Sequence, residues 1–459
     1  MSPALDIAGR LASAIGAEQV VDSPEQLATY AIDDLIPAAV ARPISPEQAA
    51  EIVRFALAEK LALVPGGSRT KYDLGMPPER YDIALDMTAL KSIVHFDPGD
   101  LTLSVDAGIP LRELNDYLQQ HGQFLPLAVP CFETSTAGGT IASGIDSALR
   151  LQYGTARDFL IGAEFIDGTG NLCKSGGRVV KNVTGYDLHK LLIGSLGTLA
   201  AITRLNFRTF PLPESFGGHV AIFSSLTGAL EYRAAIEQSG LPLANLELVS
   251  PKVLEIVQAI LRREGHPFPF EFTPGQWAVY AAFEGSEAVV QRIARELEKV
   301  SQRQTIAHGQ ILDRTQSETL GGMLREALEW LRWAAPAVVI FRLALLSPRA
   351  ALLDKVSALA GSVQLLQPAL LLRAAGVTYF ALLAAQDTEP AHAAMAATVS
   401  EVWALAKDAG GHANLLHAPA SVKRQLAGTS LVNPAMQQRI KSAFDPSGVF
   451  APGRVVGGI

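Results

Sequence analysis

The pattern of apolar and polar positions predicts an α+β protein in which the arrangement of helices and strands changes near residue 214. A helical pattern begins after Ser45 and ends near Leu61, where LALVPGG is typical of a short buried strand that enters a glycine turn. Short strands and glycine turns then alternate over residues 151–210, with one short helix expected at 187–192. The other elements expected in this half are strands at 83–86, 92–96 and 101–107 and an amphipathic helix at 111–122.

Beyond the sequence PLPES, at 211–215, strand patterns and longer helical patterns alternate. This arrangement is typical of a second α+β domain built on an antiparallel sheet. We therefore expect a domain boundary at this linker. The expected strands are at 218–225, 243–250, 277–285 and 377–386, and the expected helices are at 226–240, 286–300, 347–361 and 392–411.

Composition narrows the classes of protein that fit. The 459 residues carry a net charge of −7, which argues against nucleic-acid binding because no basic excess is available for phosphates. The two cysteines, Cys131 and Cys173, favour a reducing compartment over a disulfide framework and cannot supply the ligands of an iron–sulfur cluster. No apolar stretch is long enough to predict a transmembrane helix, so we expect a cytoplasmic protein that reaches a membrane only peripherally, through partners.

Two glycine-containing segments are candidate anion sites. In VPGGSRTK, at 64–71, consecutive glycines allow backbone N–H groups to turn inward and surround a phosphate. A plain tight turn is an equal alternative for this segment alone. ETSTAGGTIASG, at 133–144, offers a second site of the same kind, and two such sites favour a dinucleotide over a mononucleotide. Spacing predicts neither a metal site nor a nucleophile–histidine–acid arrangement.

The ordered motifs resemble a known cofactor-binding family. PGGSRTK, TAGGTIASG, YGTARD, KNVTGYDLHKLLIGSLGTL and FDPSGVFAPGR occur in the order typical of the FAD-binding domain of the vanillyl-alcohol oxidase and p-cresol methylhydroxylase type. Within that family, VVKNVTGYDL followed closely by GSLGTL is most similar to the FAD-binding subunits of bacterial glycolate oxidase. The resemblance is strong over about 40–214, weaker over 215–425, and returns at 434–454.

The resemblance implies a fold and a division of the chain. Two α+β subdomains would enclose FAD, and a ferredoxin-like α+β cap would cover the flavin. The implied parts are an N-terminal helical segment at 1–35, the FAD-binding domain at 36–214, the cap at 215–425 and a C-terminal segment at 426–459 that returns to the FAD domain.

The resemblance also implies cofactor-binding residues, from the loops that carry the motifs. Lys181 would face a phosphate or a flavin carbonyl. The implied FAD contacts are Pro65, Gly66, Gly67, Ser68, Arg69 and Thr70 at the pyrophosphate, Thr136, Gly138, Gly139 and Thr140 in a second wall, Ala142, Ser143 and Gly144 near the ring or ribityl chain, and Gly197 and Ile202 on the adenine side.

Three departures from the family pattern qualify these expectations. Ala128 stands where an acidic residue is common, and PGGSRTK contains no histidine for covalent attachment, so we expect non-covalent FAD. The catalytic relatives carry a histidine-rich GDGNxH-type segment that binds metal and substrate, and this chain has GGHANLLHAP instead. The absence of the GDGNxH-type segment implies that a partner subunit carries out most of the substrate oxidation.

Three functions remain open at this point. The resemblance favours a FAD-binding subunit that, with a catalytic flavoprotein subunit and an iron–sulfur subunit, oxidises the 2-hydroxy acid glycolate to glyoxylate. A self-sufficient FAD oxidoreductase of a hydroxy acid, alcohol or sugar is the second, with its catalytic base unknown. The third is a non-catalytic assembly module. The candidates for a base in the cap in the second case are His412, His417, Arg342 and Arg373.

Overall fold

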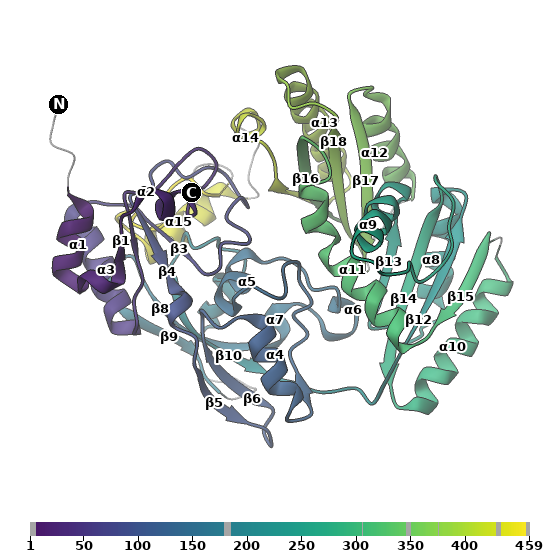
Figure 1. Ribbon diagram of the computed structural model, residues 1–459, viewed down its shortest axis with the longest axis horizontal. Helices are drawn as coiled ribbons and strands as arrows, with labels where there is room; N and C mark the ends of the chain where they lie inside the picture. The colour runs from purple at the N-terminus through teal and green to yellow at the C-terminus, as the bar shows by residue number, and fades with distance from the viewer. Residues whose placement is uncertain are drawn as a thin grey trace.

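The computed structural model describes residues 6–178, 185–304, 306–345, 350–374, 376–427 and 433–455. The first half contains two sheets that lie side by side, and the second half contains one large sheet (Figure 1). The expected α+β architecture is confirmed.

The first sheet has four strands in the order β1-β2-β4-β3, in which β2, β4 and β3 run parallel. Helix α3 (Pro46–Glu59) packs its apolar face on this sheet. It begins where Ser45 accepts a hydrogen bond from the N–H of Gln48, and ends at Lys60 in a left-handed conformation. The other elements of this part are α1 (Ile7–Ile15), η1 (Ala17–Gln19), β1 (Val20–Val21), α2 (Pro24–Ala28), β2 (Ala39–Ala41), β3 (Leu63–Gly66), β4 (Ile83–Asp86) and η2 (Met87–Ala89).

The second sheet has five antiparallel strands in the order β5-β6-β10-β8-β9. Its core side packs against the helices that follow β6, so the segment at 133–144 is held between the two sheets. The elements are β5 (Ile93–Asp97), β6 (Thr102–Asp106), α4 (Leu111–Gln119), β7 (Gln123–Phe124), α5 (Ala137–Ser143), α6 (Arg150–Tyr153), α7 (Ala156–Phe159), β8 (Leu160–Ile166), β9 (Leu172–Gly176), η3 (Leu188–Leu191), β10 (Ala201–Arg208) and β11 (Phe210–Pro211).

The cap is built on an eight-stranded antiparallel sheet in the order β15-β12-β14-β13-β17-β18-β16-β19. Each half of this order has the strand arrangement of a ferredoxin-like unit, so the expected unit occurs twice, joined edge to edge by β13 and β17. The strands are β12 (Ser215–Phe223), β13 (Asn245–Val249), β14 (Trp277–Gly285), β15 (His308–Leu312), β16 (Ala337–Ala344), β17 (Leu366–Arg373), β18 (Val377–Ala384) and β19 (His412–His417).

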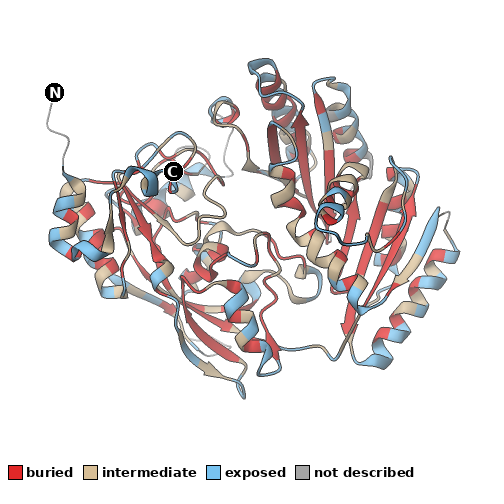
Figure 2. Ribbon diagram, in the orientation of Figure 1, coloured by how far each residue is buried: buried red, intermediate tan, exposed pale blue. Residues whose placement is uncertain are grey.

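Helices cover both faces of the cap sheet, whose strands are almost entirely buried (Figure 2). Helices α8 (Leu226–Gln238), α10 (Glu287–Gln302), α12 (Ala350–Ser362) and α13 (Glu389–Asp408) share one core. Helices α9 (Pro251–Arg263) and α11 (Arg314–Arg332) share the core on the other face, which is turned toward the first half of the chain. The sequence predictions did not include these two helices.

The C-terminal segment returns to the first sheet after α14 (Ala420–Leu426) and α15 (Pro434–Phe444). The N–H of Leu63 donates to Val449 O at 2.7 Å, and the N–H of Ala451 donates to Leu63 O at 2.7 Å. Residues 449–451 therefore lie beside β3, at the start of the VPGGSRTK segment. The domain boundaries given above remain predictions.

Candidate functional site

Three cavities follow one another from the first sheet to the cap. The central cavity, of about 500 Å³, lies at the loop after β3, and the inner cavity, of about 360 Å³, shares its glycine wall. The cap cavity, of about 380 Å³, shares Thr70 and Lys71 with the central cavity. The central cavity is lined by Val64, Pro65, Gly66, Gly67, Ser68, Arg69, Thr70, Lys71, Tyr72, Ser135, Thr136, Gly139, Ala142, Ser143, Leu196 and Arg454.

The loop after β3 presents free backbone donors to the central cavity. Within the part of the chain that the structure describes, the N–H groups of residues 67–70 make no hydrogen bond. Arg69 has a left-handed backbone (φ 65°), which turns successive N–H groups toward one side. Free N–H groups around a concavity are suited to phosphate oxygens.

The second glycine segment is a short helix, α5, rather than an open loop. Its N–H groups are already used: Gly139 donates to Thr136 Oγ1 at 3.2 Å, and Gly138 donates to Ala107 O at 2.7 Å. The expectation of a second anion nest is therefore wrong for these groups. The first loop instead packs closely against the start of α5 because Gly67 has no side chain: a Cβ on Gly67 would overlap Thr136.

Three cations and no carboxylate line the central cavity: Arg69, Lys71 and Arg454. The guanidinium of Arg69 lies 4.0 Å from the centre of the Tyr30 ring and 3.8 Å from Asp86 Oδ2, a carboxylate shared with Arg42. An acid-free cationic cavity beside free N–H groups fits the pyrophosphate of a dinucleotide.

Arg454 belongs to the returning C-terminal segment. Its guanidinium is buried and donates to Tyr72 O at 2.8 Å and to Met76 O at 3.2 Å. Burial lowers the pKa of Arg454, against the raising effect of nearby Asp33. Arg454 therefore ties the C-terminal segment to residues 72–76 at the cavity wall.

Thirteen of the fifteen predicted cofactor residues line the central or the inner cavity. The exceptions are Thr140, which is buried with an unpartnered hydroxyl, and Gly144, which ends α5 and packs against Gly194. Their roles in binding remain predictions, and Lys181 lies outside the described residues. The thirteen are Pro65, Gly66, Gly67, Ser68, Arg69, Thr70, Thr136, Gly138, Gly139, Ala142, Ser143, Gly197 and Ile202.

The sequence predictions missed several lining residues, of which Lys71, Ser135 and Arg454 are polar. Lys71 ends the PGGSRTK motif and Arg454 ends FDPSGVFAPGR, so both were inside motifs already noticed. The missing signal was their proximity, which depends on the path of the C-terminal segment.

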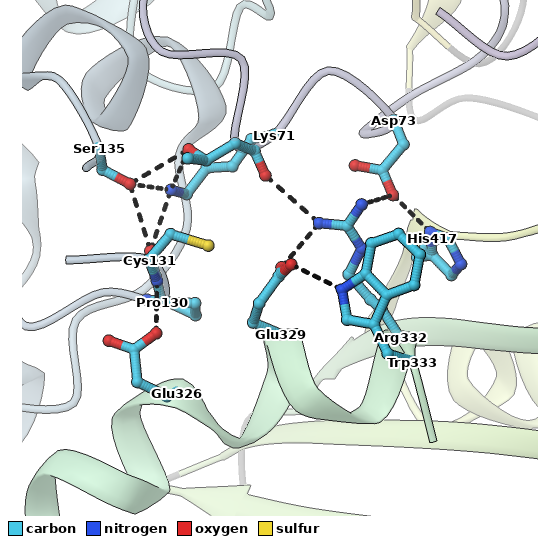
Figure 3. Close-up of polar contacts among 11 residues, drawn as sticks. Lys71, Asp73, Pro130, Cys131, Ser135, Glu326, Glu329, Arg332, Trp333 and His417 are labelled. Atoms are coloured by element: carbon cyan, nitrogen blue, oxygen red, sulfur yellow. Dashed lines mark hydrogen bonds and ion pairs between the residues drawn. The ribbon is translucent and has the colours of Figure 1, made fainter. Parts of the chain in front are cut away.

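The cap cavity lies between the FAD-binding half and the cap (Figure 3). Asp73 accepts from His417 Nδ1 and from Arg332 Nη2, the latter at 2.9 Å. Arg332 also pairs with Glu329 at 2.7 Å. Burial would raise the pKa of Asp73, but the bond to His417 and the charge of Arg332 outweigh it and hold this pKa below its usual value.

A thiol lies on the opposite side of the cap cavity. Cys131 donates its backbone N–H to Glu326 Oε2 at 2.6 Å, which ties helix α11 to the FAD-binding half. Burial, with Glu329 nearby, raises the pKa of Cys131 to about 12, so the thiol is neutral at physiological pH.

The four candidates for a base in the cap lie in different places. His417 lines the cap cavity, whereas His412 is exposed at the start of β19. Arg342 is held by Asp146 at 2.8 Å, and Arg373 is fully buried against Glu247 at 2.6 Å. Of the four, only His417 lines a cavity described above.

The described ranges of the chain contain no group of three or more His, Cys, Asp or Glu side chains placed to hold a metal ion. Among the helices of these ranges, none combines the length and the apolar character needed to cross a bilayer.

Comparison with known proteins identifies two family domains. Residues 37–176 match the FAD binding domain, and residues 213–455 match the C-terminal domain of FAD linked oxidases. The second match covers more than half of the chain. FAD is therefore the cofactor, in agreement with the donors and charges of the central cavity.

Curated relatives match parts of the chain. Glycolate oxidase subunit GlcE of Escherichia coli is 37% identical over 166 residues, which are 36% of this chain and 47% of that protein. Glycolate oxidase subunit GlcD of Bacillus subtilis is 27% identical over 55% of each chain. Mitochondrial D-lactate dehydrogenase [cytochrome] of Arabidopsis thaliana is 30% identical over 47% of this chain and 37% of its own. The matches thus span about half or less of these relatives.

Solved structures share the fold over nearly the whole chain. p-Cresol methylhydroxylase superposes with a TM-score of 0.78 at 18% identity and covers 98% of this chain and 96% of its own. Alkyldihydroxyacetonephosphate synthase gives 0.73 at 17% identity, over 96% of this chain and 85% of its own. With the fold, the cavity and both family domains in agreement, the chain belongs to the FAD-linked oxidase family.

Proposed function

We propose that the chain is the FAD-binding subunit of a glycolate-oxidase-like complex, which oxidises glycolate to glyoxylate with a catalytic flavoprotein subunit and an iron–sulfur subunit. The observation that carries the proposal is the similarity to GlcE together with the cationic central cavity, which extends from the loop after β3 to the cap cavity. In such a complex we place the chain in the cytoplasm, with membrane contact only through its partners.

The chain's own residues have separate tasks in this proposal. The free N–H groups of 67–70 and the cations Arg69 and Arg454 hold the pyrophosphate. Bound FAD accepts the electron pair released when a CH–OH group is oxidised. Helix α11 closes the cap over the groove, because Glu326 and Arg332 bond to backbone groups at Cys131 and Thr70.

A second candidate, a self-sufficient hydroxy-acid oxidoreductase, is favoured by the pair of Asp73 and His417. In the neutral tautomer with the proton on Nδ1, facing the carboxylate of Asp73, Nε2 of His417 would be free to accept a proton in the cap cavity. That is the arrangement a base needs to remove a hydroxyl proton during oxidation. The third possibility, an assembly module without flavin, requires that the purified chain be colourless.

The visible spectrum under anaerobic conditions tests these candidates. Glycolate is added to the purified chain alone and to the chain mixed with its catalytic and iron–sulfur partners, with acetate as the control acid that lacks a hydroxyl. Our proposal expects flavin bands that glycolate leaves oxidised in the isolated chain and that are reduced only in the mixture. Bleaching of the isolated chain establishes the second candidate instead, and failure of the mixture to oxidise glycolate removes the first.

A further inference from the structure

Lys71 stands where the central cavity meets the cap cavity and lines both. Its Nζ donates to Ser135 Oγ at 2.6 Å, to Pro130 O at 3.1 Å and to Thr70 Oγ1 at 3.2 Å (Figure 3). All three acceptors are neutral oxygens. Among the residues that the structure describes, Lys71 forms no ion pair. The ammonium is therefore positioned by hydrogen bonds but has no counter-ion.

The nearby acidic residues have other partners. Glu326 binds the N–H of Cys131 and Arg325, and Glu329 binds Arg332 and the indole N–H of Trp333. Burial lowers the pKa of Lys71, and Cys131, Glu329 and Glu326 oppose this effect. A desolvated ammonium without a counter-ion costs stability, which an entering anion would restore.

The charges of the central cavity suggest where that anion belongs. Each phosphate of a pyrophosphate carries one negative charge. Arg454 contributes one positive charge, and Arg42 and Arg69 together exceed Asp86 by one. The charge of Lys71 is then not needed to balance the pyrophosphate. Lys71 lies where the central cavity opens into the cap cavity.

The cap cavity has the character of a site for a small organic acid. Its two carboxylates, Asp73 and Glu329, are both paired with Arg332. Its thiol, Cys131, is neutral. The remaining wall is mostly apolar. The apolar lining residues are Leu74, Pro130, Ile145, Leu328, Ile340 and Leu416.

We propose that Lys71 binds the carboxylate of a monocarboxylic 2-hydroxy acid at the junction of the central and cap cavities. The inference rests on the second candidate function, in which this chain itself binds and oxidises a 2-hydroxy acid, and it adds the residue that recognises the charge of that acid. The rival source of the same charge is the cofactor itself, and the experiment below separates the two.

The probe is 2-hydroxyisobutyrate, whose hydroxyl-bearing carbon has no hydrogen and cannot be oxidised. It is titrated by calorimetry and by flavin difference spectra into the flavin-loaded full chain and into three variants, Lys71→Met, Lys71→Arg and Lys91→Met. Lys91 is exposed and serves as the matched control. Glycolamide, a neutral relative of glycolate, is the control ligand.

We expect Lys71→Met to bind 2-hydroxyisobutyrate about 30-fold more weakly than the parent or weaker still, with unchanged flavin content and melting temperature. Lys71→Arg should retain part of the affinity. Lys91→Met should bind as the parent does, and glycolamide should bind the parent and Lys71→Met equally weakly. The inference is overturned if Lys71→Met binds the acid as tightly as the parent, if the parent does not bind it, or if Lys71→Met loses its flavin. Loss of flavin assigns the charge to the cofactor.

The proposed function can fail separately. If the acid binds in a Lys71-dependent manner but the assembled complex does not oxidise glycolate, the site stands and the function is wrong. If a complex containing Lys71→Met oxidises glycolate with an unchanged KM, the function stands and the site is wrong.

Discussion

Gly67 and Thr136 lie against each other in the wall of the central cavity, with no space for a side chain between them. A Cβ built on Gly67 would overlap Thr136 Oγ1, the same atom that caps helix α5 by accepting from Gly139. The loop after β3 and the small-residue helix α5 therefore fix each other's position. Only glycine permits this approach, although its backbone here is not left-handed.

Replacing Gly67 with alanine should reduce flavin binding about tenfold or more. The methyl group must push the loop and α5 apart, and overpacking of this kind costs about 1–3 kcal/mol. The ratio of flavin to protein absorbance after dialysis measures the effect. Gly322→Ala, in α11 with open space around the new Cβ, should keep its flavin. Equal flavin content in both variants would contradict the close approach.

Replacing Gly139 with glutamate should abolish flavin binding, because Gly139 lines both the central and the inner cavity. The new carboxylate would repel the pyrophosphate, and its bulk would fill the groove. Gly139→Gln separates bulk from charge and should retain more flavin than the glutamate. Stoichiometric flavin in Gly139→Glu would show that the cofactor does not pass this residue.

Replacing Arg454 with methionine should lower both stability and flavin affinity. The change leaves the carbonyls of Tyr72 and Met76 without their charged donor and removes a cation from the cavity. Hydrogen bonds to charged groups contribute about 1.5–3 kcal/mol, and urea unfolding of the flavin-free chain measures that part. Arg439→Met, exposed on α15, is the control. Unchanged flavin affinity would mean that Arg454 is only structural.

The buried pair of Arg373 and Glu247 should show strong coupling in a double-mutant cycle. Both side chains are fully buried, so Arg373→Met alone strands a carboxylate and should cost about 3–5 kcal/mol. Adding Glu247→Gln should recover much of this loss, because the stranded charge disappears. Additive losses in urea unfolding would instead show that the two residues stabilise the cap independently.

Acid should destabilise the cap through His219, which is buried between Tyr232 and Ser301. Burial lowers the pKa of His219 from 6.5 to about 4. The unfolded chain therefore binds the proton first, and stability falls as the pH drops from about 6.5 to about 4. The loss attributable to this group is about 3 kcal/mol between pH 7 and pH 4.

Comparison of His219→Asn with the parent isolates that contribution. The variant is expected to be less stable at pH 7, where it loses the bonds to Tyr232 and Ser301, but its free energy of unfolding should depend less on pH. Urea unfolding at pH 7, 5.5 and 4.5 gives the pH dependence of the free energy of unfolding for the parent and for the variant. Parallel pH profiles would mean that His219 is already as accessible to protons in the folded chain as in the unfolded one.

The sequence alone determined many helices and strands and one wall of the central cavity, because residues close together in the chain specify them. Helix α3 carries its cap at Ser45 and its apolar face in adjacent turns, so neighbours in sequence specify it. The loop from Pro65 to Thr70 could be predicted for the same reason, since consecutive glycines and the strand before them set its backbone. The motif order then indicated FAD and the family, which the family matches confirm.

Tertiary structure alone decided which distant residues meet. Lys71 and Arg454 line one cavity because the C-terminal segment pairs with β3. Asp73 meets His417 because the fold brings the end of β19, in the cap, next to the segment that follows β3. The free N–H groups of 67–70 and the occupied ones of α5 look alike in sequence, since both lie in small-residue segments. They differ because hydrogen-bond partners and counter-charges come from elsewhere in the chain, and local spacing carries no information about them.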